Sequence, residues 1–285
     1  MKHLKYPLFF LGPSIILLCA FVYFPIFVTF EYSLQHYKLT DPGADGFIGL
    51  GNYAALLQDP NFQATLINNA VILALVLIAG LGLSIMMGLV LHQKHILTPI
   101  LTAMIIVPWA LPPLVNGIIW KFIFFPGFGF LNNILLQLGL IQDPLSWTSS
   151  RWMLLAIVSL VVIWRSVPFG AIIILANLQH IPQEYYESFY MDGGSSWQAF
   201  QRITLPLIVP SLTIIVINFL STAISVFDEI IALSGYRFEG QSLEVFTYMT
   251  TFNFLDFGMG SAVSYIAMIL SGLIGYAYIR YMNVQ

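Results

Sequence analysis

The sequence predicts an all-α integral membrane protein with six spanning helices. Of its 285 residues, 59% are hydrophobic and only 8% are charged. A soluble domain carries about 25% charged residues, so this composition indicates a surface that faces lipid. Six stretches are long and apolar enough to span a bilayer, which takes about 20 residues. They cover residues 7–30, 64–91, 97–125, 151–178, 206–233 and 258–281, and we expect residues 1–285 to form a single membrane domain.

Charge and cysteine content narrow the possible functions. The formal net charge is -3, and no basic stretch suggests a nucleic-acid partner. The single cysteine, Cys19, lies in an apolar run, where it is most simply a small hydrophobic residue. His92 and His95 have no carboxylate or cysteine beside them, so they fit a polar cap between two spans better than a metal site.

The first span follows two lysines near the N-terminus. Its apolar run is longer than that of a signal peptide and no small-residue cleavage site follows, so we expect an uncleaved anchor. Lysine and arginine residues that flank the spans favour a cytoplasmic N-terminus. With that orientation the inner side holds Lys2, Lys5, Lys94, Arg202 and Arg280, and the outer side holds Lys38, Arg151 and Arg237.

The third span is interrupted in its middle by Pro108 and Pro112-Pro113, close to Asn116. Interrupted helices at membrane depth occur where protein or an aqueous cavity satisfies the freed backbone groups. The break therefore fits a helix that lines a translocation path, and it fits equally a proline kink that serves packing.

The fourth and fifth spans carry polar residues at membrane depth. Arg165 lies near the centre of the fourth span, and a buried arginine is costly unless it faces a partner or water. We favour an ion pair with another span, with Asp228 as the candidate partner, over a group in a sugar path. In the fifth span, i,i+3,i+4,i+7 spacing gives a polar face that suits either a polyol or neighbouring helices. This face consists of Asn218, Ser221, Thr222 and Ser225.

Residues 180–205, between these two spans, are too polar to cross a bilayer, yet they are rich in aromatic side chains. Pro182 fits the first turn of a helix. Asp192-Gly193-Gly194 is a break at which glycine takes a positive φ. Ser195 with Gln198 is the signature of a capping box and predicts a second helix. Helices this short are only marginally stable by themselves, so we expect the pair to pack against something else. The alternative is an amphipathic loop on the membrane surface that only connects two spans.

This loop also carries a family motif. The pattern Glu187-x-x-x-x-Asp192-Gly193, followed by Ile203-x-Leu205-Pro206, resembles the EAA loop of bacterial ABC importer permeases. The wider phrase, with Trp197-Gln198-x-Phe200 between the two parts, resembles the carbohydrate branch of that family, the maltose and glycerol-3-phosphate type. The family prefers two alanines after the glutamate, whereas this chain has Ser188 and Phe189.

Segments outside the loop resemble the same permeases: residues 47–53, residues 126–133 and Phe227-Asp228. The resemblance implies the type I ABC importer permease fold, a multi-pass protein of the bacterial inner membrane with a cytoplasmic coupling helix pair between spans four and five. It implies a second homologous permease, two ATPase subunits, an extracytoplasmic sugar-binding protein and a carbohydrate substrate. The coupling residues would be Glu187, Ser188, Phe189, Asp192, Gly193, Ser196, Leu205 and Pro206. The possible substrate path comprises Asn116, Arg165, Asn218, Ser221, Thr222, Ser225 and Asp228.

The chain has no G-x-x-x-x-G-K-[ST] motif, so it lacks the phosphate-binding loop of an ATPase. We therefore expect ATP and Mg²⁺ to bind a partner, and we expect this chain to be no enzyme and to hold no cofactor.

Two other classes of function are alternatives to an importer permease. An ion-coupled secondary transporter often has inverted repeats and intramembrane carboxylates, but here the two halves do not match and Asp228-Glu229 is the only acidic pair near a span. A membrane enzyme would need a clustered nucleophile, base or metal set, and neither H-E-x-x-H nor G-x-S-x-G occurs.

Overall fold

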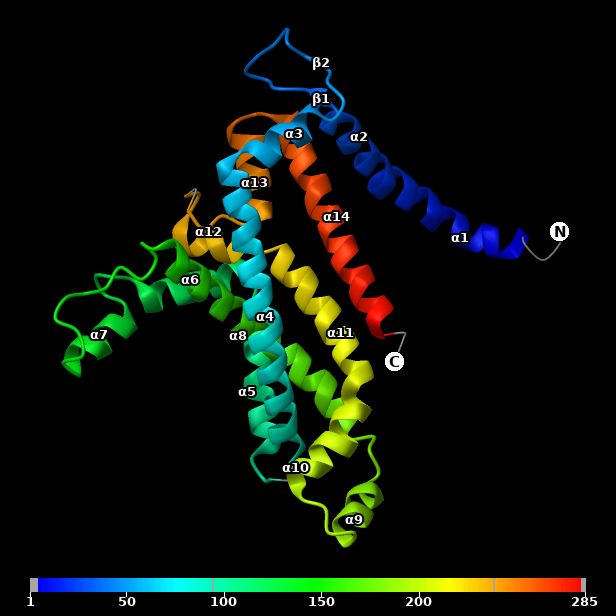
Figure 1. Cartoon of the computed structure of the whole chain (residues 1–285), viewed down its shortest axis with the longest axis vertical. Coiled ribbons are helices and arrows are strands. Elements are labelled where there is room, and N and C mark those ends of the chain that lie inside the picture. Colours follow the sequence, from blue (N-terminus) through cyan, green and yellow to red (C-terminus); the bar gives the residue numbers. More distant parts are fainter. Residues whose placement is uncertain (1–4, 94, 238, 283–285) are drawn as a thin grey trace. The chain divides into compact units, whose positions relative to one another are not determined.

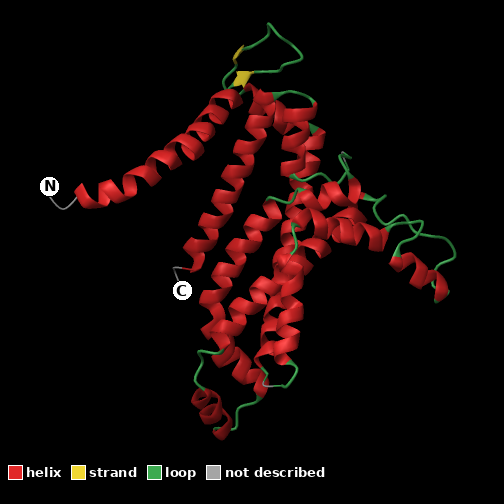
Figure 2. Cartoon of the chain, turned by 180° about the vertical axis from the view of Figure 1, so that it is seen from behind, coloured by secondary structure: helices red, strands yellow, loops and turns green. Residues whose placement is uncertain are grey.

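The structure is a computed structural model that describes residues 5–93, 95–237 and 239–282. It is dominated by helices (Figures 1 and 2), and the described strands are β1 (Gln35–His36) and β2 (Gly46–Phe47). Among the described residues, 5 helices are long and apolar enough to cross a membrane, or up to 6 if a sharply bent pair counts as one span. The predicted all-α membrane fold is therefore confirmed.

The chain divides into two compact units. The first comprises Met1–Gln63 and Phe246–Ile269, and the second comprises Ala64–Val245 and Leu270–Gln285. The predicted single domain of residues 1–285 includes positions outside the described residues and stays a prediction. Lys2 and Lys94, two of the residues that favour a cytoplasmic N-terminus, also lie outside the described residues.

The first unit contains the N-terminal helix and the polar segment that follows it. The helix runs without a break through α1 (Lys5–Leu18), the π-helical turn η2 (Cys19–Tyr23) and α2 (Phe24–Ser33), so the first predicted span is helical. The hairpin β1–β2 and helix α3 (Gly51–Gln58) come next. The buried amide of Asn52 donates to the carbonyl oxygens of Ser33 at 2.9 Å and Gln35 at 2.8 Å, which fixes α3 against the end of α2.

A close backbone approach joins this hairpin to the start of α14 (Phe257–Met282). The N–H of Gly258 donates to the carbonyl of Tyr37 at 3.1 Å. A Cβ on Gly258 would lie 2.3 Å from the carbonyl oxygen of Gln35, so only glycine fits here without a shift of the backbone. The remaining elements of this unit are the end of α13 (Leu243–Tyr248) and the π-helical turn η4 (Met249–Asn253).

The second unit is built around α8 (Arg151–Leu178), the most buried of the long apolar helices. Helix α4 (Pro60–His92) packs closely on it, because Gly170 faces Ser84 and Gly88 faces Ile174. A Cβ on Gly170 would lie 2.4 Å from the hydroxyl oxygen of Ser84, so the small residue permits the close approach of the two helices.

The third predicted span is not one straight helix. It consists of α5 (Thr98–Ala110) and α6 (Pro113–Phe124), which are bent by 101° with respect to each other. Proline has no backbone N–H, and its ring disfavours the helical conformation of the preceding residue, so Pro112-Pro113 ends one helix and starts the next. Helix α7 (Phe130–Gln137) follows α6.

The fifth predicted span, residues 206–233, also needs correction. The continuous helix is α10 (Ser196–Ala199), the π-helical turn η3 (Phe200–Thr204) and α11 (Leu205–Ile224). This helix begins at Ser196, ten residues before Pro206, and it ends at Ile224. Pro206 lies in the first turn of α11 and does not interrupt the helix. A separate short helix, α12 (Asp228–Ser234), contains Asp228 at its start.

Candidate functional site

The segment between α8 and α11 folds as the sequence predicts, with one small difference. Helix α9 (Gln183–Met191) starts just after Pro182, which occupies the N-cap position and not the first helical turn. Gly193 has φ +80° and makes the turn between the helices. The Ser195 side chain accepts from the backbone of Gln198, and the Gln198 side chain accepts from the backbone of Ser195, so both bonds of the capping box are present.

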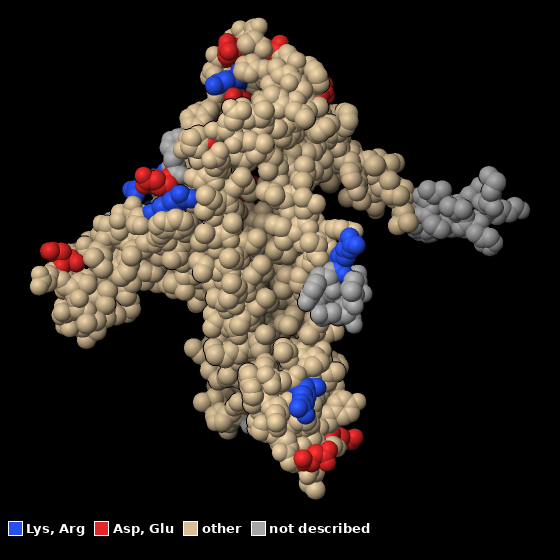
Figure 3. Space-filling model, in the orientation of Figure 1, with Lys and Arg blue, Asp and Glu red and all other residues tan. Residues whose placement is uncertain are grey.

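The helix pair α9–α10 presents an exposed surface that is both acidic and aromatic. Glu184, Glu187 and Asp192 are exposed, and Figure 3 shows acidic atoms gathered over α9. Large apolar side chains are exposed beside them: Met191 is 88% exposed and Trp197 is 65% exposed. Exposed apolar groups gathered on a polar element are typical of a protein interaction surface.

Phe189 lies inside the helix pair. A Cβ placed on Gly194 would be 2.0 Å from Cε1 of Phe189, so the ring lies directly over this glycine. The ring is half-buried there, whereas Glu187 and Ser188 on the same helix are exposed. The residue that departs from the family pattern therefore fills the turn of the pair, and Gly194 leaves room for it.

One hydrogen bond ties α9 to the start of α11 and another ties α8 to α11, and the sequence did not reveal either of them. The hydroxyl of Tyr186 lies 2.9 Å from the hydroxyl of Thr204, in the turn that leads into α11. The side-chain amide of Asn177 donates to the hydroxyl of Ser211 at 2.5 Å and joins α8 to α11. These bonds join residues far apart in the sequence, so no local pattern could indicate them.

Ser196 and Pro206 are exposed, Leu205 is half-buried, and all three belong to the continuous helix that runs from α10 into α11. The structure thus brings the predicted coupling residues into one helix pair and the start of one membrane helix.

Arg165 forms an ion pair whose carboxylate is buried, but its partner is Glu229 and not Asp228. Its Nη2 lies 3.1 Å from Oε1 of Glu229, and its Nε donates to the same oxygen at 3.2 Å. Glu229 is only 2% exposed. The predicted partner was wrong because the chain leaves the helix at residues 225–227, so the orientation of the α12 side chains does not follow from the period of α11.

Asn116 is fully buried on α6, and neither atom of its side-chain amide has a hydrogen-bond partner within the described structure. The indole nitrogen of Trp120, one turn along α6, is likewise buried without a partner. Between them, Gly117 packs on α12, where its Cβ would lie 3.1 Å from Cα of Glu229. Burying such groups unpaired is costly, which is why sites that bind polar ligands often contain them.

The predicted polar face of α11 is retained only in part. Asn218 and Thr222 are half-buried, Ser221 is exposed, and Ser225 is exposed at the C-cap. Within the described part of the chain these four side chains make no hydrogen bond to another helix. No cluster of histidine, cysteine and carboxylate side chains suited to a metal ion occurs among the described residues.

Comparison with known proteins gives a consistent picture. A family model described as "Binding-protein-dependent transport system inner membrane component" matches residues 80–283. The sulfoquinovosyl glycerol transport system permease protein SmoG of Agrobacterium fabrum is 31% identical over 96% of this chain and 89% of its own. The trehalose/maltose transport system permease protein MalF of Thermococcus litoralis is 31% identical over 90% of this chain and 87% of its own.

A solved structure has the same fold. The crystal structure of a bacterial ABC transporter involved in the import of the acidic polysaccharide alginate contains a chain that superposes with a TM-score of 0.84. The match covers 99% of this chain and 96% of that chain, at 21% sequence identity.

Proposed function

This chain belongs to the family of binding-protein-dependent transport system inner membrane components, and on that premise we propose that it carries a carbohydrate through the bacterial inner membrane in an ATP-driven importer. It is an ABC importer permease, a multi-pass subunit. The named relatives are permeases for sulfoquinovosyl glycerol and for trehalose and maltose, which supports a sugar as the substrate. An ion-coupled mechanism has no support among these relatives.

The observation that carries the coupling mechanism is the exposed helix pair α9–α10. Its exposed surface, with Glu187 and Ser188, would dock on an ATPase subunit, while Phe189, Asp192 and Gly193 shape the turn. Because α10 continues through η3 into α11 and Tyr186 is bonded to Thr204, movement of the docked pair would move the membrane helices. Closure of the ATPases on ATP would thus change which side of the membrane has access to the substrate.

The proposed substrate path uses polar groups that the chain leaves unpaired. Within the described residues, the amide of Asn116 and the polar side chains of α11, Asn218, Ser221, Thr222 and Ser225, have donors and acceptors to offer a sugar's hydroxyl groups. Asp228 begins the next helix at the end of this face. Arg165 would hold this region in shape through Glu229.

The proposed assembly contains two copies of an ATPase, a second homologous permease and an extracytoplasmic sugar-binding protein. ATP and Mg²⁺ would bind the ATPases, so this chain would hold no cofactor and catalyse no hydrolysis. A second solved structure of the same fold is a bacterial alginate ABC transporter in complex with an alginate pentasaccharide-bound periplasmic protein, which supports the binding-protein partner. The N-terminus would lie in the cytoplasm, together with α9 and α10.

Cysteine crosslinking tests the coupling role. E187C and S196C are introduced singly into a C19A background, and each importer is purified with its ATPase. We expect both cysteines to crosslink to the ATPase, with yields that change when ATP is bound. Q142C is the control, because Gln142 is also exposed but lies in the segment before α8. If both cysteines react with a maleimide yet neither crosslinks to the ATPase, the proposed coupling role is wrong.

A further inference from the structure

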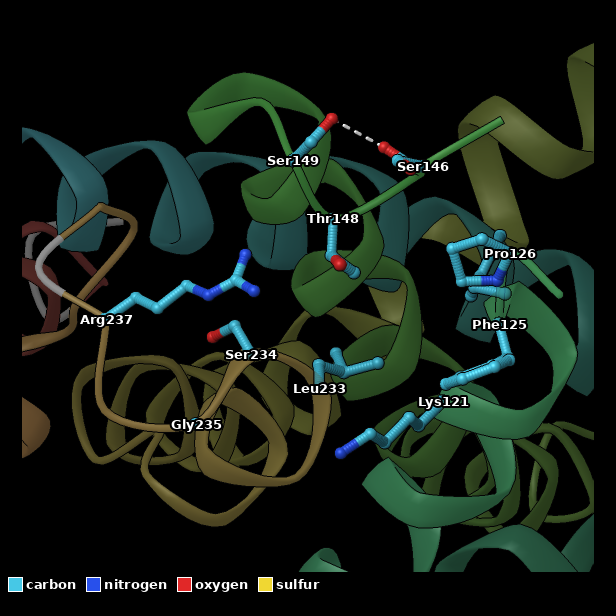
Figure 4. Close-up of a pocket in the computed structure, with 11 residues that line it drawn as sticks. Lys121, Phe125, Pro126, Ser146, Thr148, Ser149, Leu233, Ser234, Gly235 and Arg237 are labelled. Carbon is cyan, nitrogen blue, oxygen red and sulfur yellow. Dashed lines mark hydrogen bonds between the residues drawn. The ribbon is translucent and has the colours of Figure 1, made fainter. Parts of the chain in front are cut away.

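A charged cavity lies beside the N-terminal end of α8. Its volume is ≈ 460 Å³, which falls within the roughly 300–1,000 Å³ of sites that bind small molecules. The end of α6, the segment before α8, and the end of α12 with the segment that follows it form its walls (Figure 4). All of these segments belong to the second compact unit.

Two cations line this cavity, and neither forms an ion pair within the described structure. Lys121 and Arg237 approach from opposite sides in Figure 4. No carboxylate is among the lining residues, and neither cation has an ion-pair partner in the described part of the chain. Glu239 is exposed two residues beyond Arg237 and lies outside the lining. Two like charges at one cavity repel each other, and a bound anion relieves that repulsion.

Hydroxyl groups make up much of the remaining polar lining. Ser149 donates to the carbonyl of Ser146 at 2.6 Å, and Ser234 donates to the carbonyl of Ile230 at 3.0 Å. Each of these two hydroxyls has therefore placed its proton, and its oxygen is left to accept a bond from a ligand. Phe124 and Phe125 add apolar surface to the same cavity, as the carbon face of a sugar ring requires.

The wall before α8 is fixed in place by Asn132. This buried side chain accepts from the indole N–H of Trp147 at 2.8 Å and from the backbone N–H of Leu145 at 3.3 Å. Its amide donates to the carbonyl of Leu145 at 3.0 Å. The hydroxyl-bearing segment is thus preorganised, which lowers the cost of ordering it around a ligand.

We propose that this cavity binds an acidic sugar, with Arg237 and Lys121 holding the carboxylate and the hydroxyl-bearing wall contacting the ring. The combination of two cations, hydroxyl oxygens and aromatic surface in one cavity of this size fits a sugar acid better than it fits a simple anion. The inference rests on the proposed function, which makes a sugar the cargo and places this end of α8 on the extracytoplasmic side. It adds a class of substrate, a carbohydrate that carries a carboxylate.

Binding of radiolabelled D-glucuronate to the full chain in lipid nanodiscs tests this proposal. We expect saturable binding that D-glucose and acetate each displace only at much higher concentration, because glucose lacks the carboxylate and acetate lacks the ring. R237Q and K121Q should each weaken binding about tenfold or more, since each removes a charge-assisted hydrogen bond. R237K should retain more affinity than R237Q because it keeps the charge.

R280Q is the matched control, since it makes the same change at an exposed arginine outside the cavity, and it should bind like the unaltered chain. Equal displacement by acetate would reduce the cavity to a general anion site, or to a seat for an acidic side chain of the binding protein, and would overturn the proposal. Undiminished binding by both R237Q and K121Q would overturn it as well. Binding is measured without the ATPase, so its failure leaves the coupling role untouched, and a failed crosslink leaves this proposal untouched.

Discussion

At the scale of single residues, the ion pair Arg165–Glu229, with its buried carboxylate, allows a direct energetic test. Removing one member of a buried ion pair leaves an uncompensated charge, which costs about 3–5 kcal/mol. We therefore expect E229A to lower the free energy of unfolding by about that amount, as measured by denaturant unfolding in detergent.

D228A is the matched control for this pair, because it removes the neighbouring carboxylate that makes no ion pair with Arg165 among the described residues. A small effect of D228A beside a large effect of E229A identifies the partner. Equal effects of the two substitutions would contradict the assigned pair.

The half-buried carboxyl of Glu244 should make the stability of the folded protein depend on pH. Burial raises the pKa of this carboxyl above its ordinary value of 4.5, so the folded protein binds the proton more tightly than the unfolded chain does. Stability should therefore rise as the pH falls from neutral through the raised pKa, and the gain should be complete below about 4.5.

Thermal melting at a series of pH values measures this effect. E244Q, which carries no titrating group there, should melt at a higher temperature than the unaltered chain at neutral pH, and the difference should shrink as the pH falls. E239Q, at an exposed position, should follow the unaltered chain throughout. A constant difference between E244Q and the unaltered chain over the whole pH range would argue against this origin.

At the scale of elements, the turn between α9 and α10 depends on the fit of Phe189 over Gly194. Any Cβ on Gly194 forces the ring out of its place, because the nearest ring atom would be 2.0 Å away. We expect G194A to lower ATP-driven transport and the crosslinking of the helix pair to the ATPase. The G194A/F189A double variant should recover part of both, because the smaller side chain removes the clash.

The reciprocal control for this turn is F189A alone, which leaves a gap where the ring was and should have a milder effect than G194A. If the double variant is as defective as G194A alone, the clash with Phe189 is not the cause.

At the scale of the whole molecule, transport requires that movement of the helix pair reach the membrane helices. The bond between Tyr186 and Thr204 is a connection of this kind. Y186F and T204V each remove it, at a cost of about 0.5–1.5 kcal/mol. We expect these variants, reconstituted with their partner subunits, to hydrolyse more ATP for each sugar transported.

Y185F is the control for this connection, since it removes a hydroxyl from the exposed neighbour of Tyr186. An unchanged ratio of hydrolysis to transport in both Y186F and T204V would show that the bond does not take part in coupling.

Local signals in the sequence predict the local structure well. The capping box at Ser195, the glycine turn at Gly193 and the apolar stretches all appear as expected, because each depends on residues close together in the chain. The two breaks in the third and fifth spans are less predictable. The first has prolines that mark its position but not its 101° angle, and the second, after Ile224, has no proline or glycine to mark it.

Contacts between residues far apart in the chain could not be predicted from local sequence signals. Glu229 as the partner of Arg165 and Thr204 as the partner of Tyr186 follow from how helices pack, and a single sequence holds no record of that. The position of Phe189 is a similar case. The family pattern makes it a departure at a contact surface, whereas packing turns it toward Gly194.

The unbroken helix from Ser196 to Ile224 has a mechanical consequence. Its 29 residues rise by 1.5 Å each, so the rod is about 44 Å long. A rod of this length acts as a lever arm: a push of a few ångströms at Ser196, against a fulcrum near the middle, swings the far end by a similar distance in the opposite direction. Because that far end carries the polar face of α11, a small displacement at Ser196 would be enough to widen or narrow the space beside this face.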